Sequence, residues 1–296
     1  MNDSNNNVLK IKSSRLEVEM LKPGTVYNRS RFDWTSFITQ VKLDGCNTFC
    51  TSESLKENEG SGGAGLCNEF GIRMPIGYDE ILPGEEFIKI GVGLIKKESN
   101  EPYNFFKDYT VKSFSTRYEQ PDESSICFFV EPKECNGYAV SLEKRVSVEG
   151  NLLKVGYKLT NKGSKKIVTN EYCHNFISIN ENPTGKDYVL SFSNKIELEN
   201  PVGHILKSND NEIRWDICPE SDFYAGIEEL TNTCNPFIWK LVHVPSNLSI
   251  QEISKFNDYS VAIWGKGHVI SPEVFVPINI NPGETQEWQR EYEFNC

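Results

Sequence analysis

The feature that most constrains this chain is the alternation of side-chain character with a period of two. Between Leu153 and Leu159 every second residue is apolar, and the intervening Lys154 and Lys158 are charged. Such alternation is typical of a β-strand with one buried face. The segment 288–294 alternates in a similar way, with glutamate or glutamine at each intervening position. Alanine, the best helix former, occurs only four times in 296 residues, so long helices are disfavoured. The pattern predicts an all-β protein.

Turn signals separate the alternating segments. Asp44-Gly45 follows the alternating run 37–43 and predicts a hairpin. We expect the segments 138–148, 153–159 and 166–179 to form a three-stranded antiparallel meander, because short turn sequences join them.

The same spacing of strands and turns continues along nearly the whole chain. It runs from residue 16 to residue 294 without a Pro- or Ser-rich linker, and therefore predicts a single domain, 1–296, of the sandwich or barrel type. The polar stretches 53–65 and 98–104 are expected to be surface loops. Helix is expected only as a turn or two around 249–256.

Composition excludes several classes of partner. The chain has 31 basic and 42 acidic residues, a net charge of −11, whereas nucleic-acid binding favours clustered Lys and Arg. We therefore expect no nucleic-acid partner. No apolar run approaches the length of a membrane span, and the polar residues 1–7 do not resemble a secretion signal. The nine cysteines lack the paired spacing of a zinc site, and we expect reduced thiols in a cytoplasmic protein.

Histidine is scarce, which limits acid–base chemistry near neutral pH to a few positions. The four histidines are His174, His204, His243 and His268. His174 alone lies in an apolar, aromatic strand, with Tyr172 and Phe176 expected on the same face. The residues alone leave packing and catalysis equally open for this histidine.

Glu273 and a glycine-rich run are two further candidates. Glu273 is flanked by Pro272 and Val274. A carboxylate in an apolar strand costs desolvation free energy, so it is either inward and functional or outward at an edge. The run 60–65 lacks the Gly-Lys-Ser/Thr ending of a phosphate loop, and we interpret it as a mobile loop over a binding site.

These residues together resemble the galactose mutarotase (aldose 1-epimerase) superfamily, in particular its less-characterised bacterial aldose 1-epimerase-like members. The matching stretches are 28–34, 68–72, 75–79, 87–93, Asn170-Glu171-Tyr172-Cys173-His174-Asn175-Phe176, Ser271-Pro272-Glu273-Val274-Phe275, 282–284 and 292–294. Their order and spacing extend over nearly the whole chain. The stretches around His174 and Glu273 are the most specific.

The resemblance implies a β-supersandwich of antiparallel sheets with an open carbohydrate groove. It also implies a carbohydrate isomerase that interconverts the α and β anomers of an aldohexose or related sugar, without a metal or redox cofactor. By motif position, His174 would protonate the ring oxygen, Glu273 would deprotonate the anomeric hydroxyl, and Arg31 would bind sugar hydroxyls. One group must then start protonated and the other ionised near pH 7.

Further substrate-binding candidates follow from residue type and position. Three aromatic residues could stack on the apolar face of a sugar, namely Trp34, Tyr78 and Trp239. Trp34 lies beside Asp33 in a polar and aromatic cluster. The chain has no histidine before His174, whereas the well-known mutarotases have an earlier one. Glu69, Arg73 or Lys89 could replace it, and Lys89 would favour a phosphorylated or acidic sugar.

Two functions therefore remain open. The first is the isomerase, and the alternative is a non-catalytic carbohydrate-binding or regulatory protein on the same fold, which the missing second histidine favours. In either case the expected partner is a small-molecule carbohydrate. An exposed strand edge leaves a homodimer possible.

Overall fold

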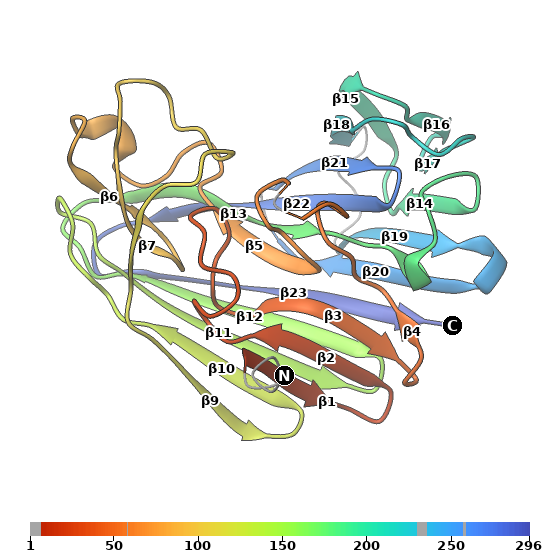
Figure 1. Ribbon diagram of the computed structural model, residues 1–296, viewed down its shortest axis with the longest axis horizontal. Coiled ribbons are helices and arrows are strands. Elements are labelled where there is room, and N and C mark those ends of the chain that lie inside the picture. Colours follow the sequence, from red (N-terminus) through yellow and green to blue (C-terminus); the bar gives the residue numbers. More distant parts are fainter. Residues whose placement is uncertain (1–6, 58, 230–235, 257–258) are drawn as a thin grey trace.

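Figure 1 shows the computed structural model, which describes residues 7–57, 59–229, 236–256 and 259–296. The sequence predicts that the N-terminal segment 1–7 is not a secretion signal. Most of this segment lies outside the described residues. Two large antiparallel sheets and one small sheet account for the described strands. Among these residues no helix is long and apolar enough to cross a membrane.

The first large sheet, sheet A, carries the face of interest. In spatial order it contains β1 (Val8–Lys12), β2 (Leu16–Leu21), β3 (Phe37–Leu43), β5 (Leu66–Phe70), β13 (Ile167–Asn175), β22 (Val269–Ile280), β21 (Ser260–Lys266), β18 (Phe223–Glu229) and β15 (Ile196–Val202), with β4 (Asn47–Thr48) paired to β3.

The second large sheet, sheet B, packs against sheet A. In spatial order it contains β16 (Leu206–Asn209), β17 (Glu212–Arg214), β14 (Tyr188–Phe192), β19 (Phe237–His243), β20 (Leu248–Ser254), β23 (Thr285–Asn295), β12 (Leu152–Asn161), β11 (Val140–Glu149), β10 (Ser125–Val130) and β9 (Thr116–Asp122). The small sheet contains β6 (Glu86–Lys89), β7 (Gly93–Lys96) and β8 (Val111–Ser113).

Side-chain alternation explains how the sheets pack. Along β11 buried and more exposed residues alternate over all ten positions, as the sequence pattern predicts. Apolar residues of both large sheets form one core cluster. The prediction of an all-β, little-helix β-supersandwich is confirmed, and in the described residues helix is limited to the single turns Tyr78–Glu80, Ile179–Glu181 and Val244–Ser246.

The predicted meander is wrong at its third strand. β11 and β12 pair as expected, but the next neighbour of β12 is β23, and β13 crosses to sheet A. Charge pairing accounts for this choice, because Lys154 and Lys158 lie opposite Glu291 and Glu287 of β23, and opposite charges across strands are favourable. β13, by contrast, is buried on both faces over most of its length and lies inside a covered sheet.

The helical turn expected around 249–256 is also wrong. Residues 248–254 form β20, which is hydrogen-bonded on one side to β19 and on the other to β23. Pairing on both sides satisfies every ladder position of this segment, which outweighs its weak local helix preference.

A buried ion network lies between the two sheets. Arg290 of β23 donates to Glu171 of β13 at 2.7 Å and to Glu252 of β20 at 2.6 Å, and all three side chains are fully buried. Burial raises the pKa of Glu252, although Arg290 opposes this shift. One guanidinium thus compensates two carboxylates in the core, joining three strands from both sheets.

Candidate functional site

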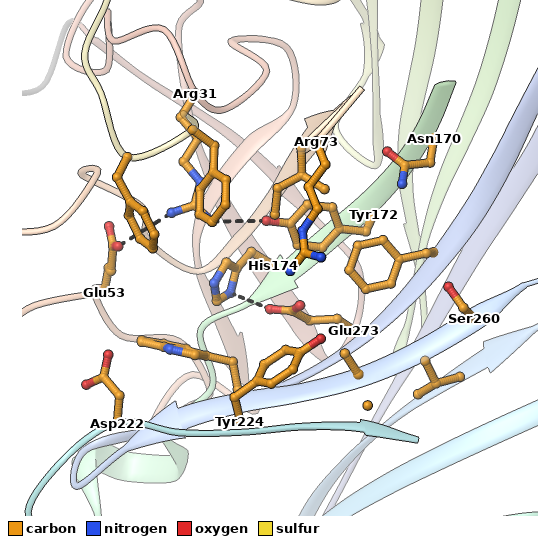
Figure 2. A pocket seen from close by; sticks show the side chains of 18 of the residues that line it. Arg31, Glu53, Arg73, Asn170, Tyr172, His174, Asp222, Tyr224, Ser260 and Glu273 are labelled. Carbon is orange, nitrogen blue, oxygen red and sulfur yellow. Dashed lines mark hydrogen bonds and ion pairs between the residues drawn. The ribbon is translucent and has the colours of Figure 1, made fainter. Parts of the chain in front are cut away.

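A large cavity lies on the face of sheet A that points away from sheet B, and its volume is about 840 Å³. Alternation decides which side chains reach it. On β13 the odd-numbered Ile167 and Cys173 belong to the core, whereas the even-numbered Tyr172 and His174 line the cavity. On β22 the cavity residues are Glu273 and Phe275. The floor is therefore a regular sheet surface rather than a set of loops (Figure 2).

His174 and Glu273 contact each other directly on this floor. Nδ1 of His174 lies 3.2 Å from Oε1 of Glu273, as drawn in Figure 2. No pyranose ring fits between atoms this close, so a ligand would lie over the pair rather than between its members. The two side chains come from adjacent strands of sheet A, and both are only about 5% exposed.

Ser271 joins the two side chains. Its Oγ lies 2.8 Å from Nδ1 of His174 and 3.1 Å from Oε1 of Glu273, and it accepts a hydrogen bond from the backbone N–H of Asn175 at 3.0 Å. A serine has one hydroxyl hydrogen. If Ser271 donates it to Glu273, then Nδ1–H of His174 donates to Ser271, and every group is satisfied. Assigned in this way from the network, Nε2 of His174 carries no proton.

The electrostatics of the pair agree with that assignment. Burial lowers the pKa of His174 well below its ordinary 6.5, and the nearby Arg31 guanidinium lowers it further. Burial raises the pKa of Glu273 to about 8, with Ser271 and Arg31 opposing the shift. At pH 7 Glu273 is therefore protonated, and His174 is neutral with its N–H on Nδ1. This distribution is the reverse of the roles that the sequence resemblance implies.

We expect this proton to make stability depend on pH above neutrality. The folded pKa of Glu273, about 8, exceeds its unfolded value, so its stabilising contribution is present at low pH and is lost as pH rises towards 8. Unfolded His174 is half protonated at pH 6.5, but this contribution is the same in wild type and in Glu273→Gln, so it cancels when the two proteins are compared. Between pH 6.5 and 8 wild type should thus lose about 1 kcal/mol of unfolding free energy per pH unit relative to Glu273→Gln. Urea unfolding at both pH values measures this, and parallel curves for the two proteins would contradict it.

Arg31 lies at the deep end of the cavity and is held from several sides. It donates to Glu69 at 3.0 Å, to Ser61 at 2.6 Å and to Tyr172 at 3.1 Å, and its guanidinium lies 4.8 Å from the centre of the Phe105 ring. Arg31 is 5% exposed, and the Glu69 carboxylate compensates its charge. Arg31 is therefore a rigid hydrogen-bond donor facing the cavity.

Glu69 and Lys89 lie behind Arg31 and not on the cavity wall. Glu69 is fully buried and also accepts hydrogen bonds from Lys89 at 3.0 Å and Tyr172 at 2.8 Å. Lys89 is 1% exposed, and its ammonium group is held by Glu69. These two predicted ligands therefore support Arg31 from within the protein, and the geometry gives Lys89 no contact with a phosphate in the cavity.

Four other predicted binding residues also lie away from the cavity lining. Asp33 is buried against Lys144 at 2.8 Å, and Trp34 donates from its indole to the Arg29 carbonyl. Tyr78 donates to the Glu101 carbonyl. Trp239 lies in sheet B, fully buried, and donates to Glu252. The large aromatic rings among them are needed to fill the interior, which residue type alone does not reveal.

Arg73 is the remaining predicted residue, and it lines the cavity. It follows β5, is exposed and points into the cavity (Figure 2). The glycine-rich run also reaches the site, since Gly60 is part of the wall. The Glu53 carboxylate, 7% exposed, accepts hydrogen bonds from the backbone N–H groups of Ser61 at 2.6 Å and Gly63 at 3.2 Å. The loop is thus pinned by a buried carboxylate rather than free.

Several cavity residues have no counterpart among the predicted ligands. Phe275 lines the cavity, and the fully buried Ser271 contacts both members of the pair. The two lie two residues either side of Glu273, and the period-two rule applied to β22 would have found them. Trp264 packs edge-on against the His174 ring at 5.1 Å between ring centres. Tyr224 and Glu199 carry no sequence signal, because strands far apart in the chain bring them to the cavity.

In the part of the chain that the structure describes, no group of three or more His, Cys, Asp or Glu residues is placed to hold a metal ion. The other described histidines lie elsewhere. His243 contacts Ser246 at 2.8 Å, and His268 contacts the backbone carbonyl of Ser52 at 3.0 Å. His204 contacts Asp216, and none of these three histidines lines the large cavity.

Comparison with solved structures identifies the fold. A galactose mutarotase related enzyme from Lactobacillus acidophilus superposes with a TM-score of 0.60 at 11% identity, covering 98% of this chain and 97% of its own. A galactose mutarotase-like protein from Lactobacillus casei gives 0.57 at 12% identity, covering 97% and 100%. A protein from Synechocystis sp. PCC 6803 gives 0.60 at 12% identity, covering 97% and 95%. No protein-family profile and no curated protein sequence matches the chain. The resemblance to the galactose mutarotase and aldose 1-epimerase-like superfamily is thus confirmed at the level of the fold.

Proposed function

We propose that this protein is an aldose 1-epimerase-type isomerase, which interconverts the α and β anomers of a reducing sugar. One observation carries the proposal: a buried histidine and glutamate in direct contact form the floor of an open cavity. Anomer interconversion needs one proton removed and one supplied, and such a pair can do both.

The proton positions suggest how each residue acts. Glu273 donates its proton to the ring oxygen while Nε2 of His174 accepts the proton of the anomeric hydroxyl. The bond between C1 and the ring oxygen breaks, and a C1 carbonyl forms. Rotation about C1–C2 and the reverse transfers close the ring on the other face. The charge that develops is a His174–Glu273 ion pair, which direct contact at 3.2 Å stabilises.

Other cavity groups suit a sugar. The fixed donor Arg31 and the exposed Arg73 can bind hydroxyl groups. Oδ1 of Asn170, at the cavity wall, is buried, and no described residue donates to it, so a sugar hydroxyl would satisfy this acceptor. The eight described cysteines are free, which accords with a cytoplasmic location as part of the proposal.

The test is the interconversion itself. We expect the decay of optical rotation of freshly dissolved α-D-glucose or α-D-galactose to accelerate in proportion to protein concentration. Anomeric proton signals in NMR spectra give the same rate independently. If a panel of aldoses reacts no faster than in buffer, the isomerase is excluded, and calorimetric binding of the same sugars would then favour a non-catalytic binding protein.

A further inference from the structure

The cavity is larger than one sugar ring requires. A six-membered ring built from bonds of about 1.5 Å measures, with its hydroxyl groups, about 6 Å across. The cavity volume of about 840 Å³ lies instead near the upper end of the roughly 300–1,000 Å³ typical of pockets for larger ligands. A single sugar ring bound over His174 and Glu273 would therefore leave the rest of the cavity floor uncovered.

Strand register places four cavity residues in a straight row. Glu273 pairs with Ala262, Ala262 with Gly226, and Gly226 with Glu199. Paired residues of antiparallel strands point to the same side, and all four line the cavity. Since neighbouring strands lie about 4.8 Å apart, the row extends about 14 Å from Glu273 to Glu199, which is the span of two sugar rings.

The middle of this row is a shallow furrow. Ala262 and Gly226 offer almost no side-chain volume, so backbone forms the floor there. On one side Tyr224 pairs with Trp264, and on the other Phe275 pairs with Ser260. All four of these flanking residues line the cavity. Aromatic rings on both sides suit the apolar faces of a sugar.

Glu199 closes the far end of the furrow. A Cβ atom on Gly226 would lie 3.1 Å from Oε2 of Glu199, so the carboxylate rests against the open face of this glycine. Glu199 is exposed, and none of the described basic residues forms an ion pair with it. A carboxylate so placed accepts hydrogen bonds from neighbouring hydroxyl groups.

We propose that the substrate is a reducing oligosaccharide of at least two rings. Its reducing ring lies over His174 and Glu273, and the second ring lies in the furrow over Ala262, with its hydroxyls towards Glu199, whose side chain covers Gly226. This inference rests on the proposed isomerase for the reaction, but the second-ring site itself can be tested by binding alone.

The test compares lactose or maltose with α-D-glucose, because the reducing ring of all three is glucose. We expect kcat/KM for the better disaccharide to exceed that for glucose about 10-fold. In Gly226→Val the new Cβ lies 3.1 Å from Oε2 of Glu199, so this strand-favouring residue displaces the carboxylate and narrows the furrow, and it should lower the disaccharide-to-glucose ratio of kcat/KM about 10-fold. Gly156→Val is the control, since a Cβ on this strand glycine of sheet B would meet only ordinary van der Waals contacts at 3.9 Å or more and the residue lies outside the cavity.

Two results would overturn the inference. The first is that wild type shows no higher kcat/KM for the disaccharide than for glucose. The second is a preference that Gly226→Val and Gly156→Val leave equally intact. If no sugar is isomerised, the proposed reaction fails, and calorimetry then decides the second-ring site: tighter binding of the disaccharide than of glucose, lost in Gly226→Val, supports the site. Equal binding, or none, refutes it.

Discussion

Glu273→Gln is expected to slow anomer interconversion by on the order of 10²- to 10⁴-fold, the usual contribution of a positioned acid or base. The amide keeps the size of the side chain and can still accept the 3.1 Å hydrogen bond from Ser271, but it has no proton to donate to the ring oxygen. His174→Ala removes the base and should cost a similar factor. Optical rotation of a freshly dissolved anomer at pH 7 measures both.

The double variant distinguishes a cooperating pair from two separate groups. Because each member needs the other to complete the proton transfers, Glu273→Gln combined with His174→Ala should be about as slow as either single variant. Glu287→Gln, on the exposed side of β23 at 65% side-chain exposure, is the control and should match wild type. If Glu273→Gln keeps the full rate, the assignment of the pair is wrong, and the wild-type assay alone then decides whether the protein is an isomerase.

Arg290→Met is expected to lower the unfolding free energy by about 3–5 kcal/mol, a large part of the roughly 5–15 kcal/mol that holds a typical protein folded. The substitution leaves Glu171 and Glu252 buried without their cation. Both carboxylates also contact tryptophan indoles, at 3.2 Å for Trp288 and 2.9 Å for Trp239. Urea unfolding followed by tryptophan fluorescence therefore reports directly on this region.

Two companion variants keep this prediction decisive. Arg214→Met removes a half-exposed arginine that pairs with Glu212, and should change the unfolding free energy by no more than about 0.5 kcal/mol. Arg290→Lys retains the charge but not the forked geometry, and should fall between wild type and Arg290→Met. A loss below about 1 kcal/mol in Arg290→Met would mean that the network contributes little to stability.

The sequence predicts the strands well because burial on one face imposes a period of two on side-chain character. The run 37–43 corresponds to β3 with the same bounds, Phe37–Leu43, and alternation over 153–159 lies within β12. Which strands pair with one another is harder to predict from the sequence. The position of β13 depends on which distant strand offers opposite charges and a matching surface, and local pattern contains no information about that partner.

The residues of the candidate site show the same contrast between local pattern, which the sequence contains, and position in the fold, which it does not. His174 and Glu273 could be singled out because each is a polar residue in an apolar strand. Arg290 follows the same rule, yet the alternation of β23 does not tell a buried ion pair from a long side chain reaching solvent. Trp239 and Lys89 were expected at a ligand and are instead buried supports. Chemical type indicates what a residue can bind, whereas its position depends on contacts between strands far apart in the chain.

The location of His174 and Glu273 on adjacent strands has an evolutionary consequence. Their separation depends on strand spacing, a quantity shared by all β-sheets, and on no loop. Mutations that lengthen, shorten or replace the segments carrying Gly60, Arg73 and Phe105 can thus alter which ligand enters while the reacting geometry is inherited unchanged. Selection on the ligand and preservation of the His174–Glu273 geometry therefore act on separate parts of the chain, so a lineage built on this face can change its ligand while it keeps the pair.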